Sequence, residues 1–207
     1  MDNRYSMSKS ANVAEVERVA VLGSTGSVGT STLDVLRMHP QKYRVEVLTS
    51  NTRIDVLREQ IEEFKPRFVV VCEAESARVL GQKLADDSSL TILSGAQALD
   101  EMVALPEVDT VMAAIVGAAG LASALCAVEH GKKVLIANKE PLVMTGRLFM
   151  QTAERTGATI LPIDSEHNAI FQCLPHDQAT HDVARIHLTA SGGPFRGKSW
   201  SSLRDVT

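Results

Sequence analysis

The sequence predicts an α/β fold in which helices cover both faces of a doubly wound parallel sheet. Short runs of β-branched and apolar residues alternate with helical stretches from Arg18 onward, and this alternation is typical of repeated βαβ units. Several of the strand runs are continuously apolar, as expected of parallel strands that are buried on both faces. A glycine-rich turn joins the first strand to the first helix, which favours a Rossmann-like version of this fold.

The same alternation predicts the individual elements up to residue 163. The expected strands are Arg18–Leu22, Arg44–Leu48, Arg67–Val71, Thr91–Leu93, Val111–Val116, Lys133–Ala137 and Thr159–Ile163. The expected helices are Ser27–Met38, Ile54–Phe64, Ala74–Ala85, Leu121–His130 and Leu142–Thr156. Beyond Ile163 the pattern changes to a helix over Glu166–Cys173 and one more strand over Val183–Thr189.

These elements divide the chain into three parts. Residues 1–15 are polar and are expected to form a flexible tail. Residues 16–163 form the Rossmann-like domain. Residues 164–207 are too few to bury a core of their own, so we interpret them as the beginning of an α+β catalytic domain.

Composition excludes several classes of protein. With 44% hydrophobic and 22% charged residues the chain is globular. A net charge of −4 without a basic run argues against a nucleic-acid partner. The three widely spaced cysteines match neither a zinc site nor a disulfide framework, which favours the reducing cytoplasm.

One uncharged stretch, Thr110–Val128, has enough consecutive residues to cross a membrane if length alone is considered. It is rich in alanine and glycine, and Gly117 and Gly120 interrupt it. We therefore expect a buried strand, a glycine turn and a close-packed helix there, with no membrane partner.

The turn after the first strand has the composition of a phosphate-binding loop. It reads Gly23-Ser24-Thr25-Gly26-Ser27-Val28-Gly29 and opens a helix. Glycines let the backbone approach a pyrophosphate, and the N–H groups of the new helix can hold the anion. The alternative is a tight strand-to-helix turn that binds nothing.

The end of the second strand indicates which dinucleotide would bind. Enzymes that use NAD usually place a carboxylate there for the ribose 2′-hydroxyl. This chain has Thr49-Ser50-Asn51-Thr52-Arg53 instead, and the polar groups of Asn51 and Arg53 suit a 2′-phosphate. NADP is therefore favoured, unless Arg53 is only a solvated residue that starts the next helix.

A polar group also follows the strand that ends at Ala137. Asn138, Lys139 and Glu140 stand at the carboxyl end of that strand, where open parallel sheets bind ligands, and Pro141 suits the first position of a helix. The alternative is a capped helix start with an exposed ion pair.

Asp164 and Glu166 form a candidate cation site. In an extended or turning segment these two carboxylates lie on one side and can hold a divalent cation, for which oxygen ligands indicate Mg²⁺ or Mn²⁺. The alternative is helix capping, with Asp164 or Ser165 as the cap and Glu166 in the first turn. We interpret His167 as structural.

A last glycine-rich turn, Thr189–Arg196, contains Ser191 and backbone amides that could receive a phosphate. It could also be a plain turn. Ser191 has no convincing His and Asp partners in the sequence, which argues against a hydrolase triad.

Taken in order, these elements resemble the 1-deoxy-D-xylulose 5-phosphate reductoisomerase family of the non-mevalonate isoprenoid pathway. The resemblance covers Arg18–Arg204. Its motifs are GSTGSVGTSTLDVLR (Gly23–Arg37), VMAAIVGAAGL (Val111–Leu121), ANKE (Ala137–Glu140), GRLFM (Gly146–Met150), LPIDSEHNAIFQ (Leu161–Gln172) and TASGGPFR (Thr189–Arg196).

The resemblance implies an enzyme that uses NADPH and Mg²⁺ or Mn²⁺. The substrate, a small phosphorylated sugar, is isomerised and reduced to 2-C-methyl-D-erythritol 4-phosphate. By similarity, the cofactor contacts are Gly23, Thr25, Gly26, Ser27, Val28, Asn138 and Glu140. The substrate contacts are Lys139, Ser165, Glu166 and Ser191, with Lys139 and Glu166 as catalytic residues and Asp164 and Glu166 as metal ligands.

The resemblance also implies that members of the family continue well beyond this length and form homodimers. Their further chain carries another metal-binding carboxylate, most of the phosphate site and a lid loop. We therefore expect the 207-residue chain to bind NADPH and to turn over little or no substrate.

Two other functions remain open at this point. One is a standalone NADP(H)-binding module without catalysis, which would need neither the Asp164–Glu166 pair nor Ser191. The other is a different reductase with a catalytic cysteine, such as a semialdehyde dehydrogenase. We expect neither Cys126 nor Cys173 to be such a nucleophile, because their helical contexts do not favour a thiolate.

Overall fold

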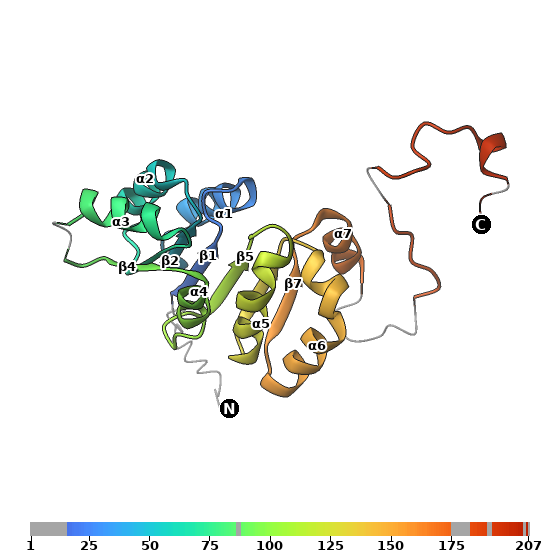
Figure 1. The fold of residues 1–207 in the computed structure, drawn as a ribbon. Helices are drawn as coiled ribbons and strands as arrows, with labels where there is room; N and C mark the ends of the chain where they lie inside the picture. The colour runs from blue at the N-terminus through green and yellow to red at the C-terminus, as the bar shows by residue number, and fades with distance from the viewer. Residues whose placement is uncertain (1–15, 86–87, 175–182, 190–191, 205, 207) are drawn as a thin grey trace, which may run out of the picture.

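A computed structural model describes residues 16–85, 88–174, 183–189, 192–204 and 206. The tail expected over residues 1–15 lies outside these residues. The described part contains a seven-stranded sheet in which every pair of neighbouring strands is parallel (Figure 1). The strands are β1 (Glu17–Leu22), β2 (Tyr43–Ser50), β3 (Phe68–Val71), β4 (Thr91–Ser94), β5 (Thr110–Ala113), β6 (Lys133–Ile136) and β7 (Thr159–Pro162).

Helices connect the strands and follow the last one. The α-helices are α1 (Ser27–Met38), α2 (Ile54–Phe64), α3 (Ala74–Lys83), α4 (Ala96–Val103), α5 (Leu121–Glu129), α6 (Glu140–Thr156) and α7 (Ser165–Cys173). Two short 3₁₀ turns are η1 (Gly117–Gly120) and η3 (Trp200–Leu203).

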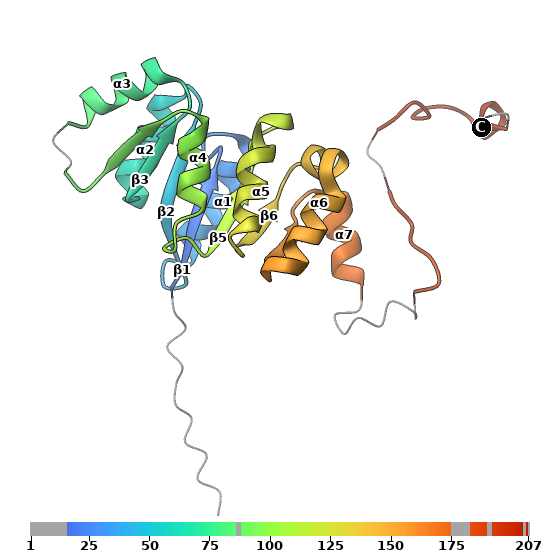
Figure 2. The same cartoon turned by 60° about the horizontal axis from the view of Figure 1, so that its bottom comes forward.

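The strand order β4-β3-β2-β1-β5-β6-β7 confirms the doubly wound sheet. The chain begins in the middle at β1, runs outward to β4, and returns to β5 on the other side of β1. Residues of α1, α2 and α3 pack on one face, and residues of α4, α5 and α6 pack on the other. Figure 2 shows α4 and α5 in front of the sheet and α1 behind it.

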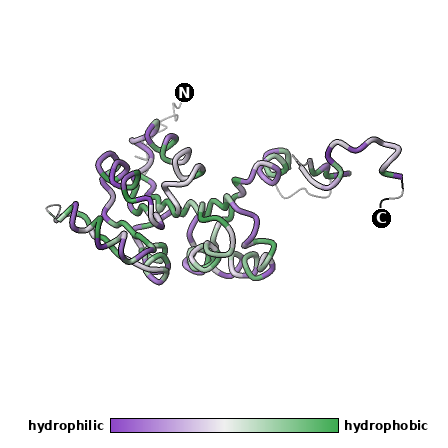
Figure 3. The backbone as a smooth tube through the Cα atoms, turned by 45° about the horizontal axis from the view of Figure 1, so that its top comes forward, coloured by the Kyte–Doolittle hydropathy of each residue, from purple (hydrophilic) through white to green (hydrophobic). Residues whose placement is uncertain are grey.

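The core lies on both faces of the sheet because the strand residues alternate between them. In β1, Val19 and Val21 pack with α1–α3, whereas Ala20 and Leu22 pack with α4–α6. All four are at most 2% exposed, which confirms that a continuously apolar run here is a doubly covered strand. Figure 3 shows green and purple stretches mixed along the helices, as expected where one helix face is buried and the other is solvated.

Charged residues line the edge of the sheet at which its strands begin. The Arg18 side chain donates two hydrogen bonds of 2.9 and 2.8 Å to the Asp109 carboxylate, and the Arg18 backbone N–H donates a third. The hydrogen bonds from this side chain hold the pKa of Asp109 below its usual value, against the opposing effect of burial. The pair joins the start of β1 to the residue before β5.

Between residues 96 and 117 two elements differ from the sequence prediction. Helix α4 was not predicted, although Ala98, Leu99 and Met102 are buried on one of its faces. Strand β5 ends at Ala113 instead of Val116, because its partners in β1 and β6 end opposite Ala113. Beyond this point the chain turns through Gly117, whose φ is +70°.

The strand predicted over Val183–Thr189 is wrong. These residues form no ladder with any strand of the described chain, and all except the half-buried Val183 are exposed. An isolated extended segment cannot satisfy its backbone groups as a strand. In Figure 1 residues 183–189 and 192–204 lie apart from the sheet.

The uncharged stretch Thr110–Val128 forms β5, η1 and most of α5, as expected. Among the residues that the structure describes, no helix combines the length and the apolar character that a membrane crossing requires.

Helix α6 is bent at Thr145, whose φ of −141° and ψ of 24° are not helical. The Thr145 hydroxyl donates to the Pro141 carbonyl oxygen over 2.9 Å. The part after the bend carries the fully buried Phe149, whereas Val143 and Met144 before it are 80% and 58% exposed. Pro141 before the bend is buried as well, so each part of α6 contacts the core through one side and exposes the other.

Candidate functional site

The glycine-rich turn lies between β1 and α1, as predicted. Gly23 has a φ of +76°, which an L side chain rarely adopts. Gly26 is the N-cap of α1 with an extended backbone, and its N–H donates to the Gly23 carbonyl over 3.0 Å. Ser27 and Val28 then begin the helix, so their backbone N–H groups lie in its first turn, where no helical acceptor is available to them.

The third glycine of the turn, Gly29, lies against the first two residues. A Cβ atom there would lie 2.3 Å from the Gly23 carbonyl oxygen and 2.6 Å from the Ser24 Cα. Only glycine fits this approach of helix to turn, which is the packing role expected of the last glycine in a dinucleotide-binding loop.

The end of β2 holds the turn through hydrogen bonds. The Gly23 N–H donates to the Thr49 hydroxyl over 2.8 Å, and the Ser24 N–H donates to the Thr49 carbonyl over 2.9 Å. The hydroxyls of Thr25 and Ser50 share a hydrogen bond of 3.0 Å. The loop is therefore fixed by its own backbone and by the neighbouring strand.

A cavity of about 480 Å³ opens beside this loop at the carboxyl ends of β1, β2 and β5. It is lined by the loop after β1, by the polar end of β2 including Asn51, and by Ala114, Ile115 and Val116 after β5. Because β1 and β5 are the strands at which the winding reverses, the cavity lies at the topological switch point, where doubly wound sheets bind their ligands.

Arg53 lies next to the same loop. It is the N-cap residue of α2, and its Nη1 donates to the Thr25 carbonyl oxygen over 2.6 Å. The guanidinium is thus directed toward the loop although the residue is exposed. The end of β2 consists of the buried residues Thr49 and Ser50, and the exposed Asn51 follows. None of these three side chains is a carboxylate.

The three polar residues predicted after β6 do not act alike: Asn138 joins two loops, whereas Lys139 and Glu140 form the start of α6. The Asn138 side-chain amide donates to the Ile115 carbonyl oxygen over 2.5 Å and so joins the loop after β6 to the loop after β5. Lys139 is the N-cap residue of α6, Glu140 begins that helix, and Pro141 follows in its first turn. The Lys139 and Glu140 side chains are exposed at the carboxyl edge.

Lys139 also reaches the predicted cation site. Its Nζ lies 3.5 Å from Oδ2 of Asp164, which is 14% exposed. The residues after β6 and β7 therefore meet at one edge of the sheet, which agrees with placing both predicted groups in one site.

Asp164 is the N-cap of α7, and Glu166 lies in its first turn. The segment is thus not extended, and the capping geometry is the one that forms: Asp164 Oδ1 accepts from the His167 backbone N–H over 3.3 Å and lies 2.8 Å from the His167 ring. Ser165 donates its hydroxyl to Glu166 over 2.9 Å. The capping contacts use Oδ1 of Asp164, whereas Oδ2 faces the Lys139 ammonium.

Partial burial acts to raise the pKa of Asp164, but the His167 N–H, the His167 ring and the Lys139 ammonium outweigh it, so this pKa lies below its usual value. The carboxylate is ionised at neutral pH, as a cation ligand must be. In the described part of the chain no three His, Cys, Asp or Glu side chains converge on one point, so Asp164 and Glu166 supply at most two protein ligands.

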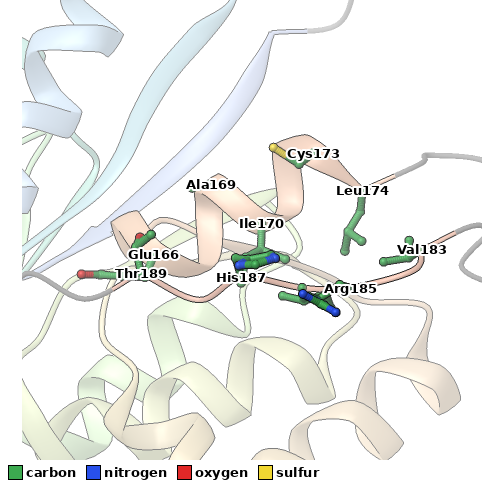
Figure 4. A pocket seen from close by; sticks show the side chains of 10 residues that line it. Glu166, Ala169, Ile170, Cys173, Leu174, Val183, Arg185, His187 and Thr189 are labelled. Atoms are coloured by element: carbon green, nitrogen blue, oxygen red, sulfur yellow. The ribbon is translucent and has the colours of Figure 1, made fainter. Parts of the chain in front are cut away.

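A second cavity, of about 310 Å³, lies between α7 and residues 183–189. Figure 4 shows Glu166 and Thr189 at one end of it and Leu174 and Val183 at the other. The sequence analysis did not single out Arg185 and His187, which line the same cavity. Ser191, the predicted substrate contact in the next turn, lies outside the described residues.

The surroundings of Cys72 and Cys126 do not favour a reactive thiolate. Burial raises the pKa of Cys72, and burial together with Asp100 and Glu129 raises the pKa of Cys126. Cys126 Sγ lies 3.7 Å from His130 Nδ1, but that nitrogen is also 2.8 Å from the Cys126 carbonyl oxygen. These surroundings favour the neutral thiol, which agrees with the expectation for Cys126.

Comparison with known proteins gives matches over nearly the whole chain. Residues 19–146 match the family model described as 1-deoxy-D-xylulose 5-phosphate reductoisomerase, and residues 160–207 match the model of its C-terminal domain. A curated protein of that name from Ralstonia nicotianae is 55% identical over 193 residues, which cover 92% of this chain and 49% of the relative. The corresponding protein of Pseudomonas putida is 55% identical over 197 residues, with 93% and 50% covered.

Solved structures agree with these relatives. A crystal structure of DOX-P reductoisomerase in complex with NADPH, fosmidomycin and magnesium has a TM-score of 0.82 and 45% identity, and the match covers 93% of this chain and 49% of that one. The reductoisomerase from Zymomonas mobilis in complex with NADPH has a TM-score of 0.82 and 42% identity, with 93% and 50% covered. The chain spans about half the length of the relatives it matches.

Proposed function

The chain belongs to the 1-deoxy-D-xylulose 5-phosphate reductoisomerase family, and from this we propose that it is the NADPH-binding part of an enzyme that isomerises and reduces 1-deoxy-D-xylulose 5-phosphate to 2-C-methyl-D-erythritol 4-phosphate. The observation that carries the proposal is the cavity at the switch point between β1 and β5, where the glycine-rich loop, the polar end of β2 and the loop after β5 meet.

The residues around this cavity fit a dinucleotide. Gly23 and Gly26 line the cavity and carry no side chain that would separate a pyrophosphate from the loop backbone. Thr25, Gly26, Ser27 and Val28 would hold the pyrophosphate, with the N–H groups of Ser27 and Val28 as donors, since the Gly26 N–H already donates to the Gly23 carbonyl. When bound, NADPH supplies the hydride for the reduction.

Specificity for NADPH would come from the end of β2. Arg53 is close enough to the loop to reach a phosphate on the adenosine ribose, and Asn51 lines the cavity beside it. A guanidinium binds a phosphate with charge-assisted hydrogen bonds, and no carboxylate of this strand end would repel it. Asn138 and Glu140, at the end of β6, would complete the cofactor contacts.

The substrate and the cation would bind at the edge where Lys139 meets Asp164. The carboxylates of Asp164 and Glu166 would hold Mg²⁺ or Mn²⁺, for which their oxygen atoms are suitable ligands. When bound, the cation polarises a substrate carbonyl. Lys139 places a positive charge 3.5 Å from Asp164, and Lys139, Ser165, Glu166 and Ser191 would contact the phosphorylated sugar, with Lys139 and Glu166 acting in catalysis.

We assign residues 16–163 to the cofactor domain and 164–207 to the beginning of the catalytic domain. The last strand of the sheet ends at Pro162 and α7 begins at Ser165, which supports a boundary there. Two carboxylates hold a divalent cation weakly, so we propose that the 207-residue chain binds NADPH but turns over little substrate. The cytoplasm and a homodimer of the full-length protein stay predictions from the sequence.

A calorimetric titration of the chain with NADPH, and then with NADH, tests the cofactor assignment. Clear binding of NADPH with much weaker binding of NADH is the expected result. Equal affinities would remove the argument from the 2′-phosphate. Binding of neither by a folded chain would overturn the assignment of a cofactor domain.

The alternative is an NADP(H)-binding module without catalysis. Binding of Mn²⁺ that depends on Asp164 separates the two functions, since a module that only binds a nucleotide has no use for the cation. Steady oxidation of NADPH by the chain with substrate and Mg²⁺ would contradict the proposal of low turnover.

A further inference from the structure

A buried glutamine lies beneath the glycine-rich loop. Gln60 is on α2 and is only 7% exposed, and its partner Ser24, in the loop, is fully buried. Neither residue lines the cavity beside the loop, so neither is among the proposed cofactor contacts. A polar pair without access to solvent needs complete hydrogen bonding to be tolerated.

The Gln60 side chain makes two hydrogen bonds with Ser24, one to its backbone carbonyl and one with its hydroxyl. Gln60 Nε2 donates to the Ser24 carbonyl oxygen over 2.9 Å, and the Ser24 hydroxyl donates to Gln60 Oε1 over 2.7 Å. The same hydroxyl lies 3.1 Å from the Thr49 carbonyl oxygen, a longer second acceptor. Throughout the described chain, every buried side-chain nitrogen or oxygen has such a partner.

A carboxamide suits this pair of contacts, because it carries a donor nitrogen and an acceptor oxygen on the same carbon atom, whereas an ionised carboxylate could not donate to the Ser24 carbonyl. A leucine or methionine of similar size would leave the Ser24 carbonyl oxygen without its Gln60 donor in a buried place. An unpaired polar group that stays buried destabilises the folded state by more than a typical hydrogen bond stabilises it, because water cannot reach the group to replace the lost partner.

Helix α2 contacts the loop at two successive residues. Arg53, its N-cap, donates to the Thr25 carbonyl, and Gln60, seven positions later, donates to the Ser24 carbonyl. Seven residues are close to two helical turns, so both side chains leave the same side of the helix. Arg53 is exposed and Gln60 is buried, which places one where a ligand can displace it and the other where none can.

We infer that Gln60 is a positioning residue for dinucleotide binding: it holds Ser24 so that the following N–H groups, from Thr25 to Val28, are already arranged for a pyrophosphate. The inference rests on the proposed function. A loop that is fixed before binding loses less conformational entropy when the anion arrives, which increases affinity without a contact to the ligand.

The position of Gln60 separates its effect from that of Arg53. The pyrophosphate is common to NADPH and NADH, whereas the 2′-phosphate belongs to NADPH alone. Gln60→Met is therefore expected to weaken both dinucleotides by the same factor, about tenfold, and to leave their ratio unchanged. Gln82→Met, on the exposed surface of α3, is the matched control and should change neither.

The experiment is calorimetry of the wild type, Gln60→Met, Ser24→Ala and the double variant with both dinucleotides, beside amide hydrogen exchange of Gly23 and Ser24. If the pair acts as one unit, the double variant loses little more than either single variant. Faster exchange of the two amides in Gln60→Met, with the parallel loss of both affinities, supports the inference.

Unchanged affinities with unchanged exchange would overturn it, and so would a loss confined to thermal stability, which a merely structural role predicts. If the wild type binds neither dinucleotide, the proposed function fails. The exchange of Gly23 and Ser24 then decides the inference by itself, since equal protection in the wild type and Gln60→Met would show that Gln60 does not order the loop.

Discussion

The guanidinium of Arg53 donates a hydrogen bond of 2.6 Å to the backbone carbonyl of Thr25, the second of the two residues between the first two glycines of the loop. This contact joins the start of α2 to the turn between β1 and α1. A cationic group is thereby kept beside Thr25, which lines the cavity, although the Arg53 residue is exposed.

Replacing Arg53 by alanine is expected to reduce the affinity for NADPH about tenfold and to leave that for NADH nearly unchanged, because the lost partner is the 2′-phosphate. Calorimetric titration of both dinucleotides measures the ratio. Arg58→Ala is the control, since Arg58 is an exposed residue of the same helix that pairs with Glu62. An equal loss for both dinucleotides would mean that Arg53 acts only on the loop.

Replacing Gly29 by alanine is expected to lower the free energy of unfolding by about 1–3 kcal/mol and to weaken NADPH binding, because the added Cβ would overlap the Gly23 carbonyl. Gly81→Ala provides the contrast. Gly81 lies inside α3 with no atom within 4 Å of an added Cβ, so alanine there should stabilise the chain by about 0.5–1 kcal/mol. Urea denaturation measures both values, and a neutral Gly29→Ala would disprove the close packing.

Replacing Asp164 by asparagine separates capping from cation binding. Asparagine caps a helix as well as aspartate does, so the free energy of unfolding should fall by no more than about 1 kcal/mol, through loss of the charge pairs with Lys139 and the His167 ring. The affinity for Mn²⁺, measured by electron paramagnetic resonance of the free ion, should fall about tenfold or more with the loss of a ligand charge. Glu154→Gln, on the exposed side of α6, is the control. Retained Mn²⁺ affinity in Asp164→Asn would place the cation elsewhere.

Replacing Asp109 by asparagine tests the ion pair with Arg18. At pH 7 the variant is expected to lose about 1 kcal/mol, a value limited by solvent screening of a part-exposed pair. The folded pKa of Asp109 lies below its unfolded value, so this stability is complete above about pH 4 and is lost as the pH falls through the folded pKa. Urea denaturation at pH 7 and near pH 3 should show the difference between wild type and variant shrinking. A difference independent of pH would contradict this origin.

The sequence predicted best the elements whose determinants are local. Helices α1 and α2 begin and end where expected, because glycine at the start of one and Pro66 after the other mark the limits within the sequence itself. The glycine-rich loop was found for the same reason. Its third glycine is needed by contacts of α1 with the turn directly before it.

Features that depend on contacts between distant parts of the chain could not be predicted from the local sequence. Val183–Thr189 has the composition of a strand, but a strand also needs a neighbour, and these residues pair with no strand of the described sheet. The pairing of Gln60 with Ser24 joins residues 36 positions apart, and nothing in the local sequence of α2 distinguishes this glutamine from a solvated one. Helix α4 was missed altogether, because only eight residues carry its apolar spacing.

The bend of α6 at Thr145 separates two kinds of mutational effect along a single helix. Residues after the bend are anchored by Phe149 in the core, and truncating such a side chain would cost about 3–5 kcal/mol of stability. Before the bend, Pro141 is buried, whereas Val143 and Met144 are exposed and lie beside the edge that carries Lys139 and Glu140. Variation at Val143 and Met144 can therefore change the surface next to the polar edge while the stability of the protein stays nearly the same.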